Sequence, residues 1–259
     1  MTPSEFQALA GATPAQMADL DLFIERLTET NAVMNLVGPD SLPDVWNRHI
    51  WDSAQLLGMK PEARTWADLG AGAGFPGLVL AILLKDRADS HVWLIDSLGK
   101  RCRFLQEAVE GLSLRATVIN GRAEEQRVKV DVVTARALAP MERLLGYAQP
   151  YLQRGAQGLF LKGEKAEAEL IEARKVWQFD SDLSVSRSDP RGRIVSVRSL
   201  RRARLPKDPH PRRLQPEGGS GQDHYRDQSR HRPGGDRREG PDRGHGSAGQ
   251  CLHRLGCST

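Results

Sequence analysis

Residues 68–77 read Asp-Leu-Gly-Ala-Gly-Ala-Gly-Phe-Pro-Gly, between the short run Thr65–Ala67 and the apolar run Leu78–Leu84. This order predicts a strand, a glycine-rich turn and a helix. Glycines in such a turn allow positive φ angles and let a ligand approach the backbone, and free N–H groups at the start of the helix face that ligand. The stretch therefore predicts a site for a nucleotide-containing cofactor in an α/β fold.

The same glycines fit two kinds of cofactor. Gly72, Gly74 and Gly77 have the spacing of the dinucleotide fingerprint, whose pyrophosphate lies on the helix N-terminus. Asp68 stands just before the first glycine, and a carboxylate there attracts a cation better than a pyrophosphate. S-adenosylmethionine carries an ammonium and a sulfonium group and no phosphate, so we favour it over NAD or FAD.

Residues expected at the same site follow the next strands. The predicted strand His91–Asp96 ends in a carboxylate where such a unit contacts the ribose, although Asp96 could equally cap the helix that follows. Two further strands, predicted at 115–120 and 130–135, lead to Ala123-Glu124 and to Arg136. Because the carboxyl ends of parallel strands meet at one edge, we expect these residues beside the glycine turn; ordinary surface-loop charges are the alternative.

Five strings of residues share their order and spacing with one known family. They are Asn35-Leu36, Arg48-His49-Ile50-x-Asp52-Ser53, the turn 68–77, Asp96-Ser97-Leu98-Gly99-Lys100-Arg101 and Ala135-Arg136-Ala137. The chain resembles, over most of residues 20–200, the 16S rRNA (guanine-N7) methyltransferase G family, also called glucose-inhibited division protein B. The resemblance implies a class I methyltransferase, with a Rossmann-like, mostly parallel seven-stranded sheet, helices on both faces and a small N-terminal helical lobe.

The resemblance also implies an activity and a set of site residues. The activity is transfer of a methyl group from S-adenosylmethionine to N7 of one guanine in 16S rRNA, near the decoding region of the small ribosomal subunit. By position, Gly70, Phe75, Ala123, Glu124 and Arg136 match the family's cofactor contacts, and the glycine pattern adds Gly72, Gly74 and Asp96. The candidate RNA contacts are Asn35, His49, Lys100, Arg101 and Lys162, each of which also fits a structural or solvated role.

Guanine N7 is a lone pair in the ring plane, so it needs no general base. We therefore predict no catalytic base, with Arg136 as a positioning residue and catalysis by alignment and electrostatics. No metal site is predicted either, because the spacing of histidines and cysteines near the C-terminus does not fit one. Cys102 lies among apolar residues of a predicted helix, where a small buried side chain is expected.

The N-terminal residues 1–60 predict a helical lobe that packs on a core formed by residues 61–200. Thr13–Gln16 form a capping box with proline at the first helical position, and a second helix is predicted from Pro43 to Leu57. In that second helix Arg48 and Asp52 stand one turn apart, a spacing typical of a surface ion pair.

Residues 201–259 differ in composition from the rest. They carry 13 basic and 7 acidic residues, a net charge of +6 in a chain of net charge +4, so residues 1–200 carry −2. Any affinity of residues 1–200 for RNA therefore has to come from local patches and not from overall charge. The segment has no Val, Ile, Met, Phe or Trp, which predicts disorder. It is either a basic arm that binds rRNA or, as we favour, an out-of-frame or read-through extension. The spacing of His245, Cys251, His253 and Cys257 matches no standard zinc finger.

Other features favour a cytoplasmic monomer. Met1–Ala10 lacks the basic and apolar regions of a signal peptide, no run has membrane-spanning length, and three cysteines do not suggest a disulfide scaffold. Three alternatives remain: an NAD-dependent oxidoreductase, although no Tyr-x-x-x-Lys pair is present; a non-catalytic rRNA-binding assembly factor; and a methyltransferase acting on small molecules.

Overall fold

A computed structural model describes residues 1–203. The expectations for the tail beyond residue 203, including its disorder and the absence of a zinc site, lie outside the described residues.

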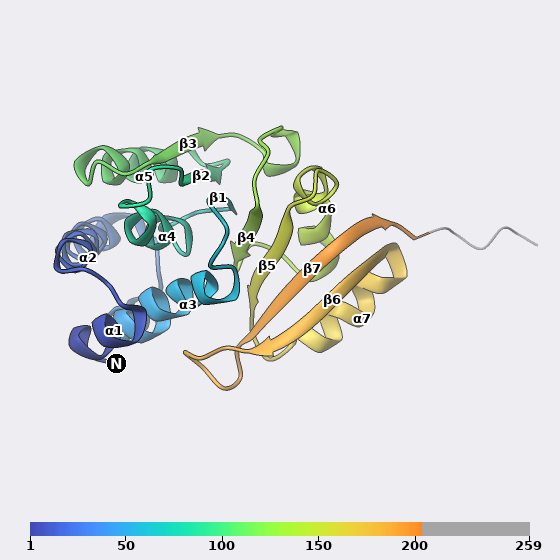
Figure 1. Cartoon of the computed structure of the whole chain (residues 1–259), viewed down its shortest axis with the longest axis horizontal. Helices are drawn as coiled ribbons and strands as arrows, with labels where there is room; N and C mark the ends of the chain where they lie inside the picture. The colour runs from blue at the N-terminus through green and yellow to red at the C-terminus, as the bar shows by residue number, and fades with distance from the viewer. Residues whose placement is uncertain (204–259) are drawn as a thin grey trace, which may run out of the picture. The chain divides into compact units, whose positions relative to one another are not determined.

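The N-terminal lobe consists of helices, as predicted (Figure 1). They are α1 (Pro3–Ala10), α2 (Pro14–Met34), the 3-10 helix η1 (Pro39–Asp44), the π-helix η2 (Trp46–Trp51) and α3 (Asp52–Met59). The capping box at the start of α2 is confirmed, since Gln16 N donates to Thr13 Oγ1 and Thr13 N donates to Gln16 Oε1.

A helical segment is present where one helix was predicted from Pro43 to Leu57, but it is not a single regular α-helix. The segment passes from 3-10 through π to α geometry, and Pro43, inside η1, has no N–H for a regular hydrogen-bond ladder. π-turns occur often at functional sites, and here the carbonyl of Arg48 in η2 accepts a hydrogen bond from Arg136.

Seven strands form one sheet in the order β3-β2-β1-β4-β5-β7-β6. Their bounds are β1 Thr65–Leu69, β2 His91–Asp96, β3 Ala116–Asn120, β4 Val132–Arg136, β5 Gln157–Lys162, β6 Trp177–Val185 and β7 Arg193–Arg202. The first five pair in parallel, whereas β7 pairs antiparallel with β5 and β6. The predicted mostly parallel seven-stranded sheet is confirmed, and the strand expected near residues 193–198 is the inner strand of the final pair.

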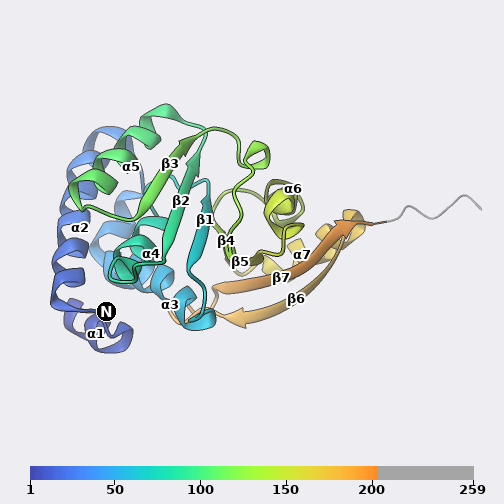
Figure 2. The ribbon, with the colours of Figure 1, turned by 45° about the horizontal axis from the view of Figure 1, so that its top comes forward.

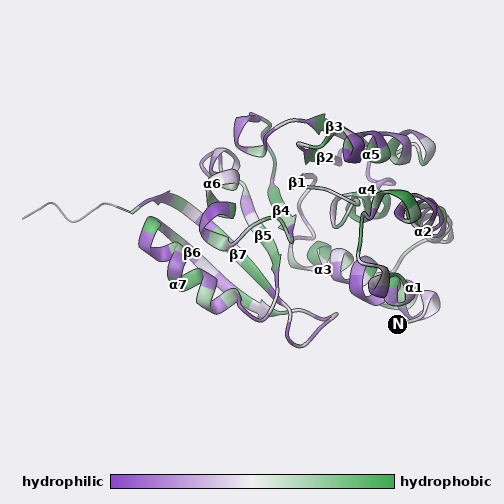
Figure 3. Ribbon diagram, turned by 180° about the vertical axis from the view of Figure 1, so that it is seen from behind, coloured by the Kyte–Doolittle hydropathy of each residue, from purple (hydrophilic) through white to green (hydrophobic). Residues whose placement is uncertain are grey.

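Helices cover both faces of the sheet (Figure 2). They are α4 (Gly77–Leu84), α5 (Gly99–Gly111), α6 (Met141–Leu152) and α7 (Ala166–Val176), with a short 3-10 turn, η3 (Ala123–Glu125), after β3. Side chains alternate along β1: Trp66 belongs to the core formed with α2, α4 and α5, and Leu69 belongs to the core formed with α6 and α7. Helix α4 is hydrophobic nearly all round (Figure 3) because it is buried on nearly all sides.

Candidate active site

The glycine-rich turn between β1 and α4 has the predicted backbone geometry. Gly70, Gly72 and Gly74 have φ angles of 69°, 54° and 92°, a region that residues with a Cβ rarely adopt. The turn is fastened to β2, because Gly70 N donates to Ile95 O at 2.8 Å and Gly72 N donates to Asp96 Oδ2 at 3.0 Å. The carboxyl ends of β1 and β2 are thus held side by side.

A pocket of about 300 Å³ lies at the carboxyl ends of these strands. It is lined by Gly70, Ile95, Asp96, Ser97, Leu98, Arg101, Gly121, Arg122, Ala123, Glu124, Ala137, Leu138 and Tyr147. Four predicted cofactor residues, at positions 70, 96, 123 and 124, therefore converge as expected, and Arg101 joins them. The other lining residues were not predicted as cofactor contacts. Ile95 and Tyr147 lie in β2 and α6, where periodicity indicates packing, and the rest lie in turns, which carry no periodic signal.

The pocket combines carboxylates with an apolar wall. Asp96 accepts from Gly72 N through Oδ2 and from Leu98 N at 2.8 Å through Oδ1, so it holds the turn before α5 and lines the pocket. Helix α5 has no side-chain cap, so the alternative of Asp96 as its cap is wrong. Leu98 leaves 52% of its surface exposed and lines the pocket together with Leu138. Carboxylates fit the hydroxyls and ammonium of a nucleoside amino acid, and an apolar wall fits its base. The residues present therefore fit S-adenosylmethionine.

Asp68 does not face this pocket, which corrects the expectation that its carboxylate attracts the cofactor directly. Its side chain is fully buried and accepts from Gly77 N at 2.8 Å. Burial raises the pKa of Asp68 to about 7, against the lowering effects of the Gly77 N–H and of Arg136. Asp68 thus fastens the start of α4, a role local sequence could not distinguish from ligand binding.

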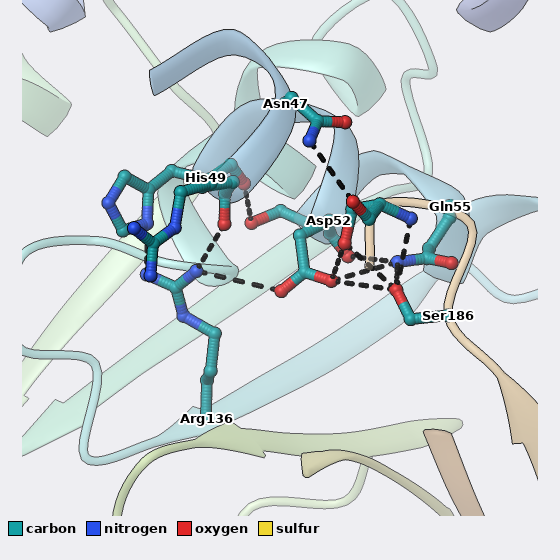
Figure 4. Close-up of polar contacts among 9 residues, drawn as sticks. Asn47, His49, Asp52, Gln55, Arg136 and Ser186 are labelled. Atoms are coloured by element: carbon teal, nitrogen blue, oxygen red, sulfur yellow. Dashed lines mark hydrogen bonds and ion pairs between the residues drawn. The ribbon is translucent and has the colours of Figure 1, made fainter. Parts of the chain in front are cut away.

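Arg136, at the end of β4, points toward the N-terminal lobe (Figure 4). Its Nη1 donates to Arg48 O at 3.0 Å, its Nη2 lies 2.7 Å from His49 Nδ1, and its guanidinium lies 5.0 Å from the centre of the Phe75 ring. The His49 ring stacks on Phe75 with centroids 4.7 Å apart. Arg136 therefore joins β4, the glycine-rich turn and η2, but neither it nor Phe75 lines the pocket; their contact with cofactor stays a prediction.

His49 is buried and neutral. Burial, reinforced by Arg136 and Arg48, lowers the pKa of His49 to about 3. Because the guanidinium of Arg136 can only donate, Nδ1 of the ring must accept, which assigns the proton to Nε2. Nε2 is buried without a hydrogen-bond partner among residues 1–203. In this structure His49 therefore does not present its ring at the surface, and its contact with RNA stays a prediction.

Asp52 pairs with Arg136 rather than with Arg48, which corrects the predicted ion pair within one helix. Its Oδ2 lies 3.6 Å from Arg136 Nη1. Its Oδ1 accepts from the hydroxyls of Ser188 at 2.6 Å and Ser186 at 3.1 Å, which come from the turn between β6 and β7. The π-helix η2 precedes Asp52 and directs its side chain inward. The spacing of Arg48 and Asp52 in a regular α-helix could not predict that direction.

The remaining candidate RNA contacts lie in different surroundings. Asn35 is an exposed C-cap of α2 with φ 49°, and Lys100 is exposed at the start of α5. Lys162 is 10% exposed, pairs with Glu169 at 2.6 Å and donates to Ala139 O at 2.9 Å. Cys102 is buried as predicted, with Sγ 3.2 Å from Asp96 O.

Within residues 1–203, no helix is long and apolar enough to cross a membrane.

Comparison with known proteins matches this chain to one family. A model of the family described as rRNA small subunit methyltransferase G matches residues 16–191. Ribosomal RNA small subunit methyltransferase G of Caulobacter vibrioides is 59% identical over 199 residues, covering 77% of this chain and 92% of that protein. The protein of the same name from Methylorubrum populi is 48% identical over 186 residues, 71% of this chain and 88% of that one. A SAM-dependent methyltransferase structure from Aquifex aeolicus, 16% identical, covers 67% of this chain and 97% of its own with a TM-score of 0.47.

Proposed function

The chain belongs to the rRNA small subunit methyltransferase G family, and we propose that it transfers a methyl group from S-adenosylmethionine to N7 of one guanine in 16S rRNA, near the decoding region. The NAD-dependent alternative is not favoured by these relatives. The observation that carries the proposal is the pocket at the carboxyl ends of β1 to β4, which unites the positive-φ glycine turn with Asp96 and the 121–124 loop.

Specific residues would hold the cofactor there. Asp96 suits the ribose hydroxyls, Glu124 suits a cationic group, and Leu98 with Leu138 suits the faces of a base. Gly70 is favoured there because its φ of 69° strains a residue with a Cβ, and a Cβ would also displace the end of the Leu138 side chain. When bound, S-adenosylmethionine supplies an electrophilic methyl group on a sulfonium.

The protein's part in the reaction is alignment. Guanine N7 attacks with a free lone pair, so no residue has to remove a proton. His49, whose pKa is lowered to about 3 and whose Nδ1 accepts from Arg136, would be a weak base in any case. Arg136 places a fixed positive charge beside the glycine-rich turn. Fixed charges and dipoles in a partly buried site lower the barrier more than they would in water, and correct placement of the reacting atoms supplies most of the rest.

The test begins with calorimetric titration of the purified protein with S-adenosylmethionine and, separately, with NAD. Radiolabelled methyl transfer is then measured on small ribosomal subunits that lack N7-methylguanosine, with the label identified after digestion to nucleosides. Binding of S-adenosylmethionine with label in N7-methylguanosine supports the proposal. Label in another nucleoside overturns the N7 assignment, and binding of NAD alone overturns the enzyme class.

The substrate form belongs to the same proposal. We place the enzyme in the cytoplasm, where small subunits assemble, and propose that it acts as a monomer. Free 16S rRNA and assembled small subunits, compared as substrates, determine which form is methylated. Mass measurement of the working enzyme in solution determines its oligomeric state.

A further inference from the structure

The turn 186–192 between β6 and β7 lies at the ligand edge of the sheet, although it comes late in the chain. Arg193, the first residue of β7, is in register with Lys162 at the carboxyl end of β5. Leu161 of β5 is in register with Arg136 at the end of β4. The turn is therefore placed at the same edge of the sheet as Arg136 and the glycine-rich turn.

This turn is fastened to the N-terminal lobe. The hydroxyls of Ser186 and Ser188 both donate to Asp52 Oδ1, and Asn47 Nδ2 donates to Ser188 O at 3.0 Å (Figure 4). The Arg193 guanidinium closes the other end by donating to Pro190 O at 2.8 Å. Side chains on the turn therefore project from a fixed base, so that less entropy is given up when they bind a ligand.

Two exposed arginines lie close together on η2 and on this turn, and we call Arg48 and Arg191 the arginine surface. The side chain of Arg48 makes no hydrogen bond or ion pair within residues 1–203. Arg187, also on the turn, lines a separate pocket with Gln55, Leu83 and Asp86 and does not belong to this surface. Arg191 is 77% exposed, and its Nε lies 3.6 Å from Asp189 Oδ1. The pKa of Asp189 is lowered, first by the Arg191 N–H and also by the charges of Arg191 and Arg48, so both arginines act on one region.

The arginine surface supplies positive charge on this side of the site: Arg48 has no partner within residues 1–203, and Arg191 is paired only with the half-exposed Asp189. Lys162, the lysine expected to bind RNA here, is held by Glu169. Residues 1–200 carry a net charge of −2, so attraction to RNA cannot come from the overall charge of this part of the chain. Guanidinium groups also match phosphate geometry better than ammonium groups do.

We propose that the arginine surface binds the phosphate backbone of the substrate RNA and holds it while the target base reaches the site. The inference rests on the proposed function and adds the route by which the RNA approaches, over η2 and the 186–192 turn. Each phosphate contact contributes affinity that depends on salt and not on sequence.

The test measures KM for small subunits at several salt concentrations, for the full chain and for the variants Arg48→Ala, Arg191→Ala and their combination. The double variant is expected to raise KM roughly five-fold or more and to reduce the salt slope by about 0.7–0.9 for each phosphate that the protein no longer neutralises. The affinity for S-adenosylmethionine, measured separately by titration, is expected to match that of the unchanged chain.

Two further variants separate binding from folding. Arg154→Ala removes an exposed arginine from the loop before β5, at the opposite edge of the sheet, and is expected to leave KM unchanged. Asp189→Asn removes the opposing charge while keeping an oxygen for the Arg191 N–H, and is expected to lower KM. If the parent protein methylates subunits and the double variant has the same KM as the parent, the inference is overturned. If the parent protein itself does not methylate subunits, the proposed function is overturned instead.

Discussion

Arg136 Nη2 donates to His49 Nδ1 across 2.7 Å, and this hydrogen bond joins the end of β4 to the π-turn of the N-terminal lobe. The two residues stand 87 positions apart in the chain. Both also contact the Phe75 ring of the glycine-rich turn, His49 by stacking and Arg136 through its guanidinium. The end of β4, the glycine-rich turn and η2 are distant in sequence. They are held together by the guanidinium of Arg136 and the rings of His49 and Phe75.

Replacement of Arg136 by alanine is expected to lower methyl transfer by at least ~10²-fold, because the variant lacks the group that aligns these segments. Single-turnover transfer to small subunits measures the effect. Cys102→Ser is the matched control: Cys102 is buried, and serine keeps a donor for Asp96 O, so transfer is expected to stay near normal. A near-normal rate for Arg136→Ala would remove Arg136 from the site.

His49 is expected to remain neutral throughout the pH range in which the enzyme works. Its pKa is about 3 in the folded chain and 6.5 when unperturbed, so the unfolded state binds the extra proton between these values. The contribution of His49 to stability is therefore fully present above pH 6.5 and is lost as the pH falls toward 3. Imidazole NMR signals of His49 should not titrate between pH 5 and 8.

The variant His49→Gln gives a second check on the same assignment. Without the imidazole, the loss of stability between pH 6.5 and pH 3 is expected to become shallower in denaturant unfolding followed across that range. An unaltered pH profile of stability in His49→Gln would contradict the buried neutral ring.

Asp68 affects stability in the opposite sense. Its pKa is raised to about 7, so its contribution to stability is present at low pH and is lost as the pH rises through 7.

Local pattern predicted most of the fold, because strand, turn and helix signals depend on neighbours in sequence. The turn 68–77 and the strands ending at Asp96 and Arg136 show this. The pairing of Asp52 could not be predicted in that way. Helical spacing pointed to Arg48, whereas the π-turn and the packing of β4 brought Arg136 to Asp52. The burial of Asp68 was also hidden, since a carboxylate before a glycine turn looks the same whether it faces a ligand or an amide.

Asp52 is expected to act through Arg136. In Asp52→Asn the charge beside Arg136 is removed while an oxygen remains for Ser188, so stability should fall less than the about 3 kcal/mol typical of a broken buried ion pair. Methyl transfer is expected to fall roughly ten-fold through misplacement of Arg136. A double-mutant cycle with Arg136→Ala measures the coupling: transfer in the double variant should equal that of Arg136→Ala alone. Additive losses would show that Asp52 acts independently.

Two glycines in helices provide an opposed pair of stability predictions. A Cβ at Gly77 would lie 2.7 Å from Asp68 Oδ2 and would also meet Leu94 Cδ2, so Gly77→Ala is expected to cost about 1–3 kcal/mol and to weaken binding of S-adenosylmethionine. A Cβ at Gly58, inside α3, would meet nothing within 4 Å, so Gly58→Ala should stabilise by about 0.5–1 kcal/mol through helix propensity. Denaturant unfolding of both variants measures these changes. Equal effects in the two would show that helix propensity, and not the contact with Asp68, controls the start of α4.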